Sequence, residues 1–304
     1  MSVAPAQRAD PQRLRAYLLL AASMALVGSY VALSKPLVAA LPVFVLAWLR
    51  FGIAAVAMLP WTPRARDEPP LTRSEHGQLF LMSFFGNFLF SICMLSGVAR
   101  TSATAAGVIM ATLPAVVALL SVVLLRERLS RRALLAVALA VGGIAVLQFT
   151  RGDGDSRGSS LIGNALMLGA VLCEAIYVIL AKRLSATRAP LRVSALINLW
   201  GLALITPLGL WQLPSAPLAA LGAGTWMLLL FYSLAASLFA VWLWMAGMRH
   251  VRANEAGVFT VALPVAATLV GVLLLGEQLT LLHVAALLLA SAGVLLIARA
   301  APQP

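Results

Sequence analysis

Two charged residues, Arg50 and Glu174, lie inside long apolar stretches of this chain. A charged side chain at the depth of a lipid bilayer is costly, and it normally faces the interior of a helix bundle or water. A guanidinium there can hold a carboxylate with two parallel hydrogen bonds. Arg50 is therefore predicted to anchor the carboxylate of a solute. In the alternative, Arg50 binds Glu174 or carbonyls at a helix end and only holds the fold together.

Other polar residues lie in apolar stretches of the same kind, and they complete the predicted lining of a substrate cavity. Two pairs recur at an offset of 150 residues, Asn87 with Ser237 and Ser83 with Ser233. Serine is the weaker signal, because its hydroxyl often bonds a carbonyl of its own helix. The cavity candidates are Arg50, Asn87, Ser91, Glu174, Tyr177, Asn198, Ser233 and Ser237.

The elements that must position these residues are membrane-spanning helices. The chain is 62% hydrophobic and 11% charged, which is far from the balance of a soluble domain. Its apolar stretches are about 20 residues long, the length that a helix needs to cross a bilayer. They do not alternate between apolar and polar residues as the strands of a membrane barrel would. The prediction is an all-α integral membrane protein with ten transmembrane helices, at about 16–33, 42–61, 78–98, 101–124, 131–149, 161–183, 190–210, 222–245, 253–275 and 281–298.

The net charge of +12 is distributed as a topology signal rather than as a surface for nucleic acid. With the N-terminus in the cytoplasm, seventeen Lys and Arg residues fall on the cytoplasmic side and four on the outside. Such an excess of basic residues is typical of the cytoplasmic loops of membrane proteins. Both terminal tails, residues 1–15 and 299–304, are therefore predicted to be cytoplasmic.

The second half of the chain repeats the first. Residues 103–143 align without gaps on residues 253–293, and 16 of the 41 positions are identical. Because each copy has five helices, an odd number, the second copy enters the membrane from the opposite face. The sequence predicts two inverted five-helix repeats, 16–149 and 161–298, joined by a periplasmic linker, 150–160.

The repeat places a proline and a glutamate at equivalent positions in each half. Pro114 and Pro264 lie near mid-helix, where proline removes a backbone hydrogen bond and kinks the helix. Each acts either as a hinge for alternating access or only in packing. Glu127 and Glu277 precede residues that can cap the next helix, and they are predicted to brace the turn before it. The functional alternative is proton coupling through Glu277.

Small residues recur at helical spacing in the last helix of each half, and they allow backbones to approach closely. No charged residue lies deep in these two helices. They are therefore predicted to pack at the periphery or between subunits, while the other eight line the cavity. The small residues are Ala136, Ala140 and Gly143 in the first half, and Ala286, Ala290 and Gly293 in the second.

These motifs resemble the EamA family of the drug/metabolite transporter superfamily. The family's pattern of a mid-helix proline and a closing GEQLT is similar to Pro114 with RERLS and to Pro264 with GEQLT. Its opening motif resembles GSYVALSK at residues 28–35, which is repeated as AIYVILAK at 175–182, although Val27 stands where the family often has Trp. Within the superfamily, the chain looks most like YddG-type bacterial amino-acid exporters.

This resemblance implies the export of amino acids, aromatic ones included, with broad selectivity across a bacterial inner membrane. Transport would proceed by alternating access through a central cavity between the two repeats, without ATP. The partners expected are amino acids as substrates and membrane lipids. The alternatives are a carrier of another small metabolite or drug, such as an organic cation or a nucleotide sugar, and also a channel or a lipid scramblase.

No enzymatic function is predicted. His76, His250 and His283 lie on separate segments without the spacing of metal ligands, and no metal or cofactor is expected. A pump driven by ATP would need a phosphate-binding loop, for which the sequence has no motif. Both a monomer and a homodimer stay open.

Overall fold

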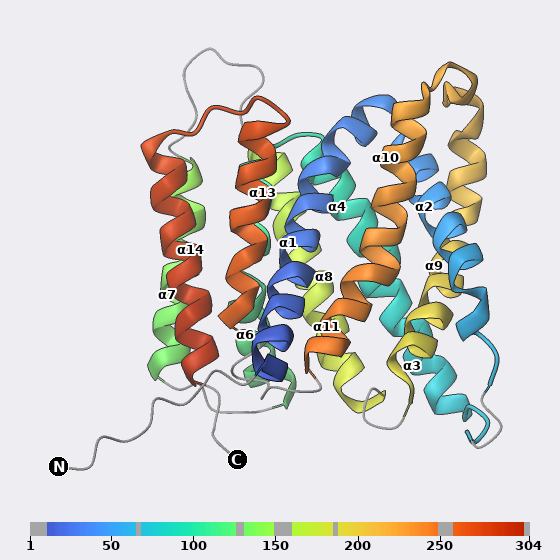
Figure 1. Cartoon of the computed structure of the whole chain (residues 1–304), viewed down its shortest axis with the longest axis horizontal. Helices are drawn as coiled ribbons and strands as arrows, with labels where there is room; N and C mark the ends of the chain where they lie inside the picture. Colours follow the sequence, from blue (N-terminus) through green and yellow to red (C-terminus); the bar gives the residue numbers. More distant parts are fainter. Residues whose placement is uncertain are drawn as a thin grey trace.

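A computed structural model describes residues 11–64, 68–125, 131–148, 160–184, 188–248 and 258–300. Throughout these ranges the regular structure is helical, and the main helices lie side by side in one bundle (Figure 1). In chain order they are α1 Pro11–Ala40, α2 Val43–Met58, α3 Arg73–Ser83, α4 Phe90–Val98, α5 Ala103–Met110, α6 Leu113–Leu125, α7 Arg131–Gln148, α8 Leu161–Leu184, α9 Pro190–Gln212, α10 Ala223–Leu234, α11 Ala240–Met248, α13 Ala262–Leu273 and α14 Leu281–Ala300.

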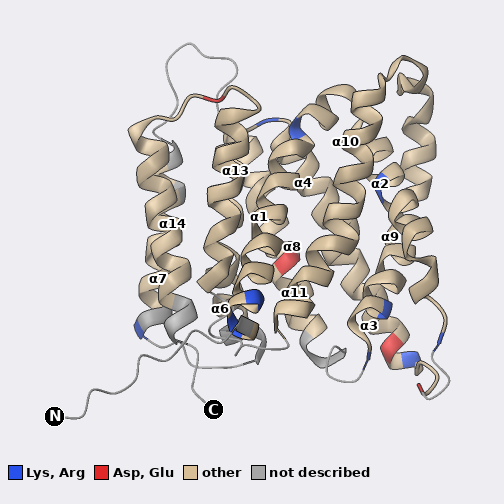
Figure 2. Ribbon diagram, in the orientation of Figure 1, with Lys and Arg blue, Asp and Glu red and all other residues tan. Residues whose placement is uncertain are grey.

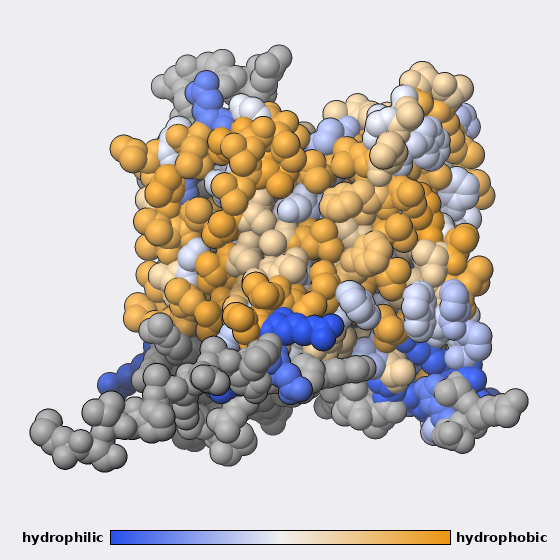
Figure 3. All heavy atoms as spheres, viewed as in Figure 1, coloured by the Kyte–Doolittle hydropathy of each residue, from blue (hydrophilic) through white to orange (hydrophobic). Residues whose placement is uncertain are grey.

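Seven of the described helical segments are long and apolar enough to cross a membrane. Three shorter apolar helices cover Leu134–Gly143, Phe259–Leu273 and Leu281–Leu296. Apolar side chains form a broad band around the middle of the molecule (Figure 3), and charged residues gather mainly at the ends of the helices (Figure 2). A multi-pass membrane protein follows from these features, whereas ten spans and cytoplasmic termini remain predictions.

Two of the apolar segments contain a π-helical turn that the sequence did not predict. The turn Phe84–Leu89 joins α3 to α4, and the turn Ala235–Phe239 joins α10 to α11. The two turns lie at equivalent positions of the two halves. A π-helical turn widens the helix by one residue, leaves part of the backbone without its usual partners and often lies at a functional site.

Prolines set several of the boundaries. The break between α5 and α6 comes directly before Pro114, which cannot donate the hydrogen bond that a continuous helix requires. Pro42 and Pro190 precede or open α2 and α9, where a missing amide hydrogen has no consequence. The predicted end of the first span at residue 33 is wrong, because α1 continues to Ala40 with Pro36 inside it.

The helices pack in groups that combine the two halves. α1 lies against α11 and α13, α8 against α4 and α6, and α2 against α9. Gly28 permits the first of these contacts, since a Cβ added to it would lie 2.1 Å from the carbonyl oxygen of Leu263. The core therefore contains side chains from both halves of the chain.

α7 and α14 form a pair at one side of the bundle (Figure 1). Ala136, Ala286 and Ala290 are buried between helices, and a Cβ on Gly143 would lie 3.2 Å from the carbonyl oxygen of Ala286. The small residues of the two helices thus allow the close contact that the sequence indicated. The side chain of Ala140 lies outside the described residues.

Candidate functional site

Arg50 is buried on α2, near the middle of the bundle. Its Nη1 donates a hydrogen bond of 2.9 Å to the hydroxyl of Ser91 on α4, while its Nε has no hydrogen-bond partner in the described part of the chain. It forms no ion pair with Glu174, although both residues are described. The guanidinium therefore keeps a free donor in an apolar environment, where an unsatisfied charged group is costly.

Aromatic rings cover the guanidinium of Arg50. Its central carbon lies 4.7 Å from the ring centroid of Phe51 and 5.5 Å from that of Tyr232. Cation–π contacts at such distances contribute about 0.5–2 kcal/mol each, more when they are desolvated. Tyr30 of α1 meets Tyr232 edge to face, with 5.8 Å between ring centroids. The hydroxyl of Tyr232 is buried and interacts with the guanidinium of Arg50.

Glu174 brings a negative charge to the same region from α8, in the other half of the chain. It interacts electrostatically with Arg50, Tyr30 and Tyr177. Its side chain is partly exposed, and within the described ranges no hydrogen bond reaches its carboxylate. We call Arg50, Ser91, Glu174, Tyr30 and Tyr232 the central cluster.

Asn87 and Ser83 connect the first π-helical turn to α9. The side-chain amide of Asn87 and the hydroxyl of Ser83 both donate to the carbonyl oxygen of Ile197, at 2.8 and 2.7 Å. Both residues are buried. They satisfy a backbone carbonyl between helices, which is a structural role.

Asn198 and Ser237 form a contact within the second half. The hydroxyl of Ser237 donates to the side-chain carbonyl of Asn198 at 3.2 Å, and the Asn198 amide donates to the carbonyl oxygen of Ser194 at 2.9 Å. Asn198 is buried. The prediction that Asn198 points toward water is therefore wrong, because its hydrogen-bonding groups are used inside the protein.

The other two cavity candidates also have local partners. Ser233 donates to the carbonyl oxygen of Leu229 in its own helix, at 2.7 Å. The ring of Tyr177 packs on Gly86 in the first π-helical turn, where an added Cβ would lie 2.6 Å from the ring. Of the eight candidates, the structure brings together Arg50, Ser91 and Glu174. Tyr30 and Tyr232 also lie in this cluster, although neither is among the eight predicted cavity residues.

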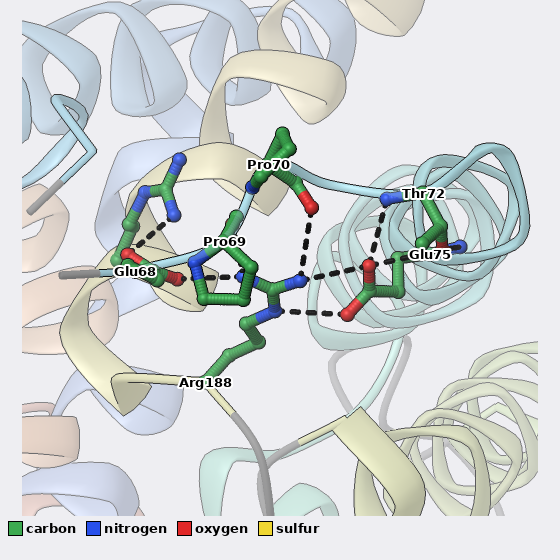
Figure 4. Close-up of polar contacts among 7 residues, drawn as sticks. Glu68, Pro69, Pro70, Thr72, Glu75 and Arg188 are labelled. Carbon is green, nitrogen blue, oxygen red and sulfur yellow. Dashed lines mark hydrogen bonds and ion pairs between the residues drawn. The ribbon is translucent and has the colours of Figure 1, made fainter.

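The end of the bundle where α1 begins, here called the proximal end, holds a second charged group (Figure 4). Arg188 contacts Glu75 at 2.8 Å and Glu68 at 3.3 Å, and Arg192 also pairs with Glu68. Burial raises the pKa of Glu68, but hydrogen bonds from Arg192 and Arg188 bring it below its usual value. These contacts join the segment before α3 to the start of α9. No sequence motif predicts these contacts.

At the opposite, distal end, Glu277 joins three segments. One oxygen of its carboxylate accepts hydrogen bonds from the ammonium of Lys35 on α1, at 3.0 Å, and from the backbone N–H of Ala103. The other oxygen accepts hydrogen bonds from the backbone N–H and the hydroxyl of Thr104, each at 2.9 Å. The prediction that Glu277 braces the turn before α14 is wrong, because its carboxylate caps α5 of the other half. Glu127 lies outside the described residues.

Close helix packing accompanies this contact at the distal end. A Cβ on Gly107 of α5 would lie 2.4 Å from the Cβ of Ala267 on α13, and 3.6 Å from the Cα of Pro264. Pro264 is thus part of the contact between halves, and Pro114 follows the break between α5 and α6. α5 and α13 are thus in close contact near the distal end.

A groove of about 720 Å³ opens on another face, between α2, α9 and α10. Its lining is almost wholly apolar and includes Gly52, Val56 and Leu230. The indole of Trp48 donates to the hydroxyl of Thr206 at 3.1 Å at one side of it. None of the central cluster lines this groove, so it does not serve as the predicted polar cavity.

A family model described as "EamA-like transporter family" matches residues 14–149 and 161–299. The chain belongs to this family. It is 36% identical over 274 residues to the "Uncharacterized transporter YetK" of Bacillus subtilis, covering 90% of this chain and 83% of the relative. An "Uncharacterized transporter" of Archaeoglobus fulgidus is 25% identical, covering 73% and 77% of the two chains. The EamA chain is therefore a membrane transporter.

A solved crystal structure has a similar fold. It superposes with a TM-score of 0.63 and covers 94% of this chain and 99% of its own, at 17% sequence identity. At this identity the similarity concerns the fold alone. The family is one of transporters, and nothing in the comparisons indicates a catalytic activity.

Proposed function

We propose that this EamA transporter exports amino acids, aromatic ones included, from the cytoplasm of a bacterium. The proposal rests on the environment of Arg50. Its buried guanidinium has an Nε without a hydrogen-bond partner among the described residues, and it lies against the ring of Tyr232. A carboxylate is the planar anion that a guanidinium binds best, through paired charge-assisted hydrogen bonds. The neighbouring rings favour an aromatic substrate side chain.

The number of charges also supports an amino acid over a phosphorylated solute. Arg50 is the basic residue of the central cluster, and Lys35 lies at the distal end, in contact with Glu277. A nucleotide sugar or sugar phosphate carries more than one negative charge and would leave part of it without a partner in a low-dielectric site. A single carboxylate matches a single guanidinium.

The proposed cycle is alternating access between the two repeats in the inner membrane. The close contact of α5 with α13 near the distal end is consistent with a state that is narrow on that side. In the orientation predicted from the Lys and Arg bias, the distal end faces the periplasm. A cysteine placed at Ser156 should then be labelled only from the periplasm and one at Ser130 only from the cytoplasm. Labelling of both from one side would contradict this orientation.

The function is tested with purified protein in proteoliposomes. A panel of radiolabelled amino acids, measured by counterflow with and without a pH gradient, should show exchange of phenylalanine, tyrosine and tryptophan above empty liposomes. Cells that express the protein should also tolerate toxic aromatic analogues better than cells with the empty vector. If flux and resistance both match the controls, amino acids are not the substrate.

One observation favours a second candidate, a carrier of organic cations. Glu174 is partly exposed and interacts with Tyr30 and Tyr177, and a carboxylate among aromatic rings is a suitable site for such a cation. The same liposomes, tested with tetraphenylphosphonium as a cation without a carboxylate, separate the two candidates. Exchange of this cation without exchange of amino acids would establish the second.

A further inference from the structure

We propose that Glu174 binds the ammonium group of the same molecule whose carboxylate Arg50 holds, so that the central cluster selects zwitterions. This inference rests on the proposed function and names the chemical class that the site accepts. It assigns the two charges of the ligand to the two halves of the chain, since Arg50 lies on α2 and Glu174 on α8.

The two side chains carry opposite charges and interact electrostatically, yet they form no ion pair. In a low-dielectric environment an unpaired charge is strongly unfavourable, and an Arg and a Glu within reach of each other normally pair. The hydrogen bond to Ser91 holds Arg50 on α4 instead. Arg50 and Glu174 thus interact electrostatically without direct contact of their charged groups.

Each of the two groups has capacity for a ligand. The Nε of Arg50 is an unused donor, and the carboxylate of Glu174 accepts no hydrogen bond in the part of the chain that the structure describes. Glu174 is partly exposed, so a ligand can reach it. The hydroxyl of Tyr232, which interacts with the guanidinium of Arg50, can donate its own proton to a ligand carboxylate.

An α-amino acid fits this pair because its carboxylate and ammonium lie on the same carbon. A ligand with a carboxylate but no ammonium would bind Arg50 and leave Glu174 without a partner. A ligand with an ammonium but no carboxylate would bind Glu174 and leave Arg50 without a partner. A site with unpaired buried groups rejects a ligand that lacks the matching group much more strongly than an apolar pocket rejects a small change of shape. Both analogues should therefore bind less tightly than the zwitterion.

The test compares three ligands that share a phenyl ring: phenylalanine, 3-phenylpropionate without the ammonium, and 2-phenylethylamine without the carboxylate. Each is measured as a competitor of labelled phenylalanine in proteoliposomes, and as a ligand of the purified protein by isothermal titration. The wild type should bind phenylalanine best. In Glu174→Gln the affinity for phenylalanine should fall at least about tenfold, the order expected when one charge-assisted hydrogen bond is lost. The affinity for 3-phenylpropionate should be unchanged or higher.

Two further variants separate binding from a general loss of structure. Glu174→Asp keeps the charge and should keep the order of the three ligands, and its folding is checked by gel filtration. Glu277→Gln removes a carboxylate at the distal end, far from the cluster along the chain, and should leave the ratio of phenylalanine to 3-phenylpropionate affinities as in the wild type. Arg50→Gln should shift the preference the other way, toward 2-phenylethylamine.

The outcomes distinguish the two proposals. If the wild type binds phenylalanine but Glu174→Gln leaves the affinity ratio of phenylalanine to 3-phenylpropionate unchanged, the role of Glu174 is refuted and amino-acid transport stands. The same conclusion follows if Glu174→Gln weakens all three ligands equally, since this shows a structural role. If the wild type neither binds nor exchanges any amino acid, the proposed function fails, and the inference fails with it.

Discussion

The two halves of the molecule share a π-helical turn at equivalent positions, but most side chains of the central cluster differ between them. Each half has a π-helical turn at the equivalent place, and in each a polar side chain near that turn bonds α9. Four of the five residues of the central cluster differ between the halves, whereas the fifth, Tyr30, matches Tyr177. When the halves are aligned by their sequence offsets, the counterparts of Arg50, Ser91, Glu174 and Tyr232 are Asn198, Val241, Val27 and Met82.

This difference separates scaffold positions from site positions. An inverted repeat gives an approximately two-fold scaffold, whereas an amino acid has no two-fold symmetry and needs a cation at one end and an anion at the other. Positions that match between the halves, such as Asn87 and Ser237, bond protein groups. Positions that do not match, such as Arg50 and Glu174, have hydrogen-bonding groups without a partner in the described part of the chain, and these groups are available to a ligand. Divergence between the repeats thus marks the site better than polarity alone.

The strongest test of this comparison is Arg50. Arg50→Lys keeps the charge but loses the planar pair of donors, and Arg50→Gln loses both. We expect apparent affinity for phenylalanine to fall about tenfold in the first and transport to be abolished in the second, with normal amounts of folded protein. Transport in proteoliposomes and gel filtration measure the two quantities. Unchanged affinity in either stable variant would leave Arg50 with a structural role only.

The counterpart of Arg50 provides the control. Asn198→Ala removes the partner of Ser237 and should destabilise the protein by about 1–3 kcal/mol, because a buried hydrogen-bonding group loses its partner. Apparent affinity in the folded fraction should stay as in the wild type. A loss of affinity as large as that of Arg50→Lys would show that the two halves share the site equally.

The sequence was sufficient to predict a helical membrane protein and its family, and the role of Arg50 and Glu174 in a site stays a prediction. The π-helical turns could not be predicted, since one extra residue in a uniformly apolar helix leaves no pattern to detect. The free Nε of Arg50 depends on the position of Ser91, and the contact of Glu277 with α5 joins segments 173 residues apart. Such tertiary contacts between the halves have no local signal, which is why Glu277 and Asn198 were misplaced.

A smaller effect is expected at a glycine that both halves share. Gly107 matches Gly257 and lies against Ala267, so Gly107→Ala would force α5 and α13 apart. We expect a loss of stability of about 1–3 kcal/mol, as for other overpacked contacts, and greater access to the cluster from the distal end. Gly52 has open space around it and no glycine counterpart, and Gly52→Ala should leave the melting temperature unchanged or slightly higher. Equal effects in both variants would contradict a special role for the α5–α13 contact.

The distal contact of Glu277 predicts a pH dependence. Burial raises the pKa of Glu277, but hydrogen bonds from Thr104, Ala103 and Lys35 bring it below its ordinary value of 4.5. A carboxyl whose pKa is lowered by folding contributes stability above its unfolded value, and this contribution is lost as the pH falls through the folded value. The wild type should therefore melt higher than Glu277→Gln at neutral pH, and the difference should disappear as the pH falls below about 4.5. A difference that persists in acid would show that packing, rather than charge, closes this end.

The smallest expected effects come from two serines, one in the site and one in the scaffold. Ser91→Ala removes the acceptor for the Arg50 Nη1, so the guanidinium is held less firmly and apparent affinity for phenylalanine should fall about threefold to tenfold. Ser237→Ala removes a 3.2 Å hydrogen bond to Asn198 and should reduce stability by about 0.5–1.5 kcal/mol without changing affinity. Transport assays measure apparent affinity, and thermal melts of the same samples measure stability. If Ser91→Ala changes only the melting temperature, or Ser237→Ala changes affinity, a mismatch between the repeats does not identify the binding residues.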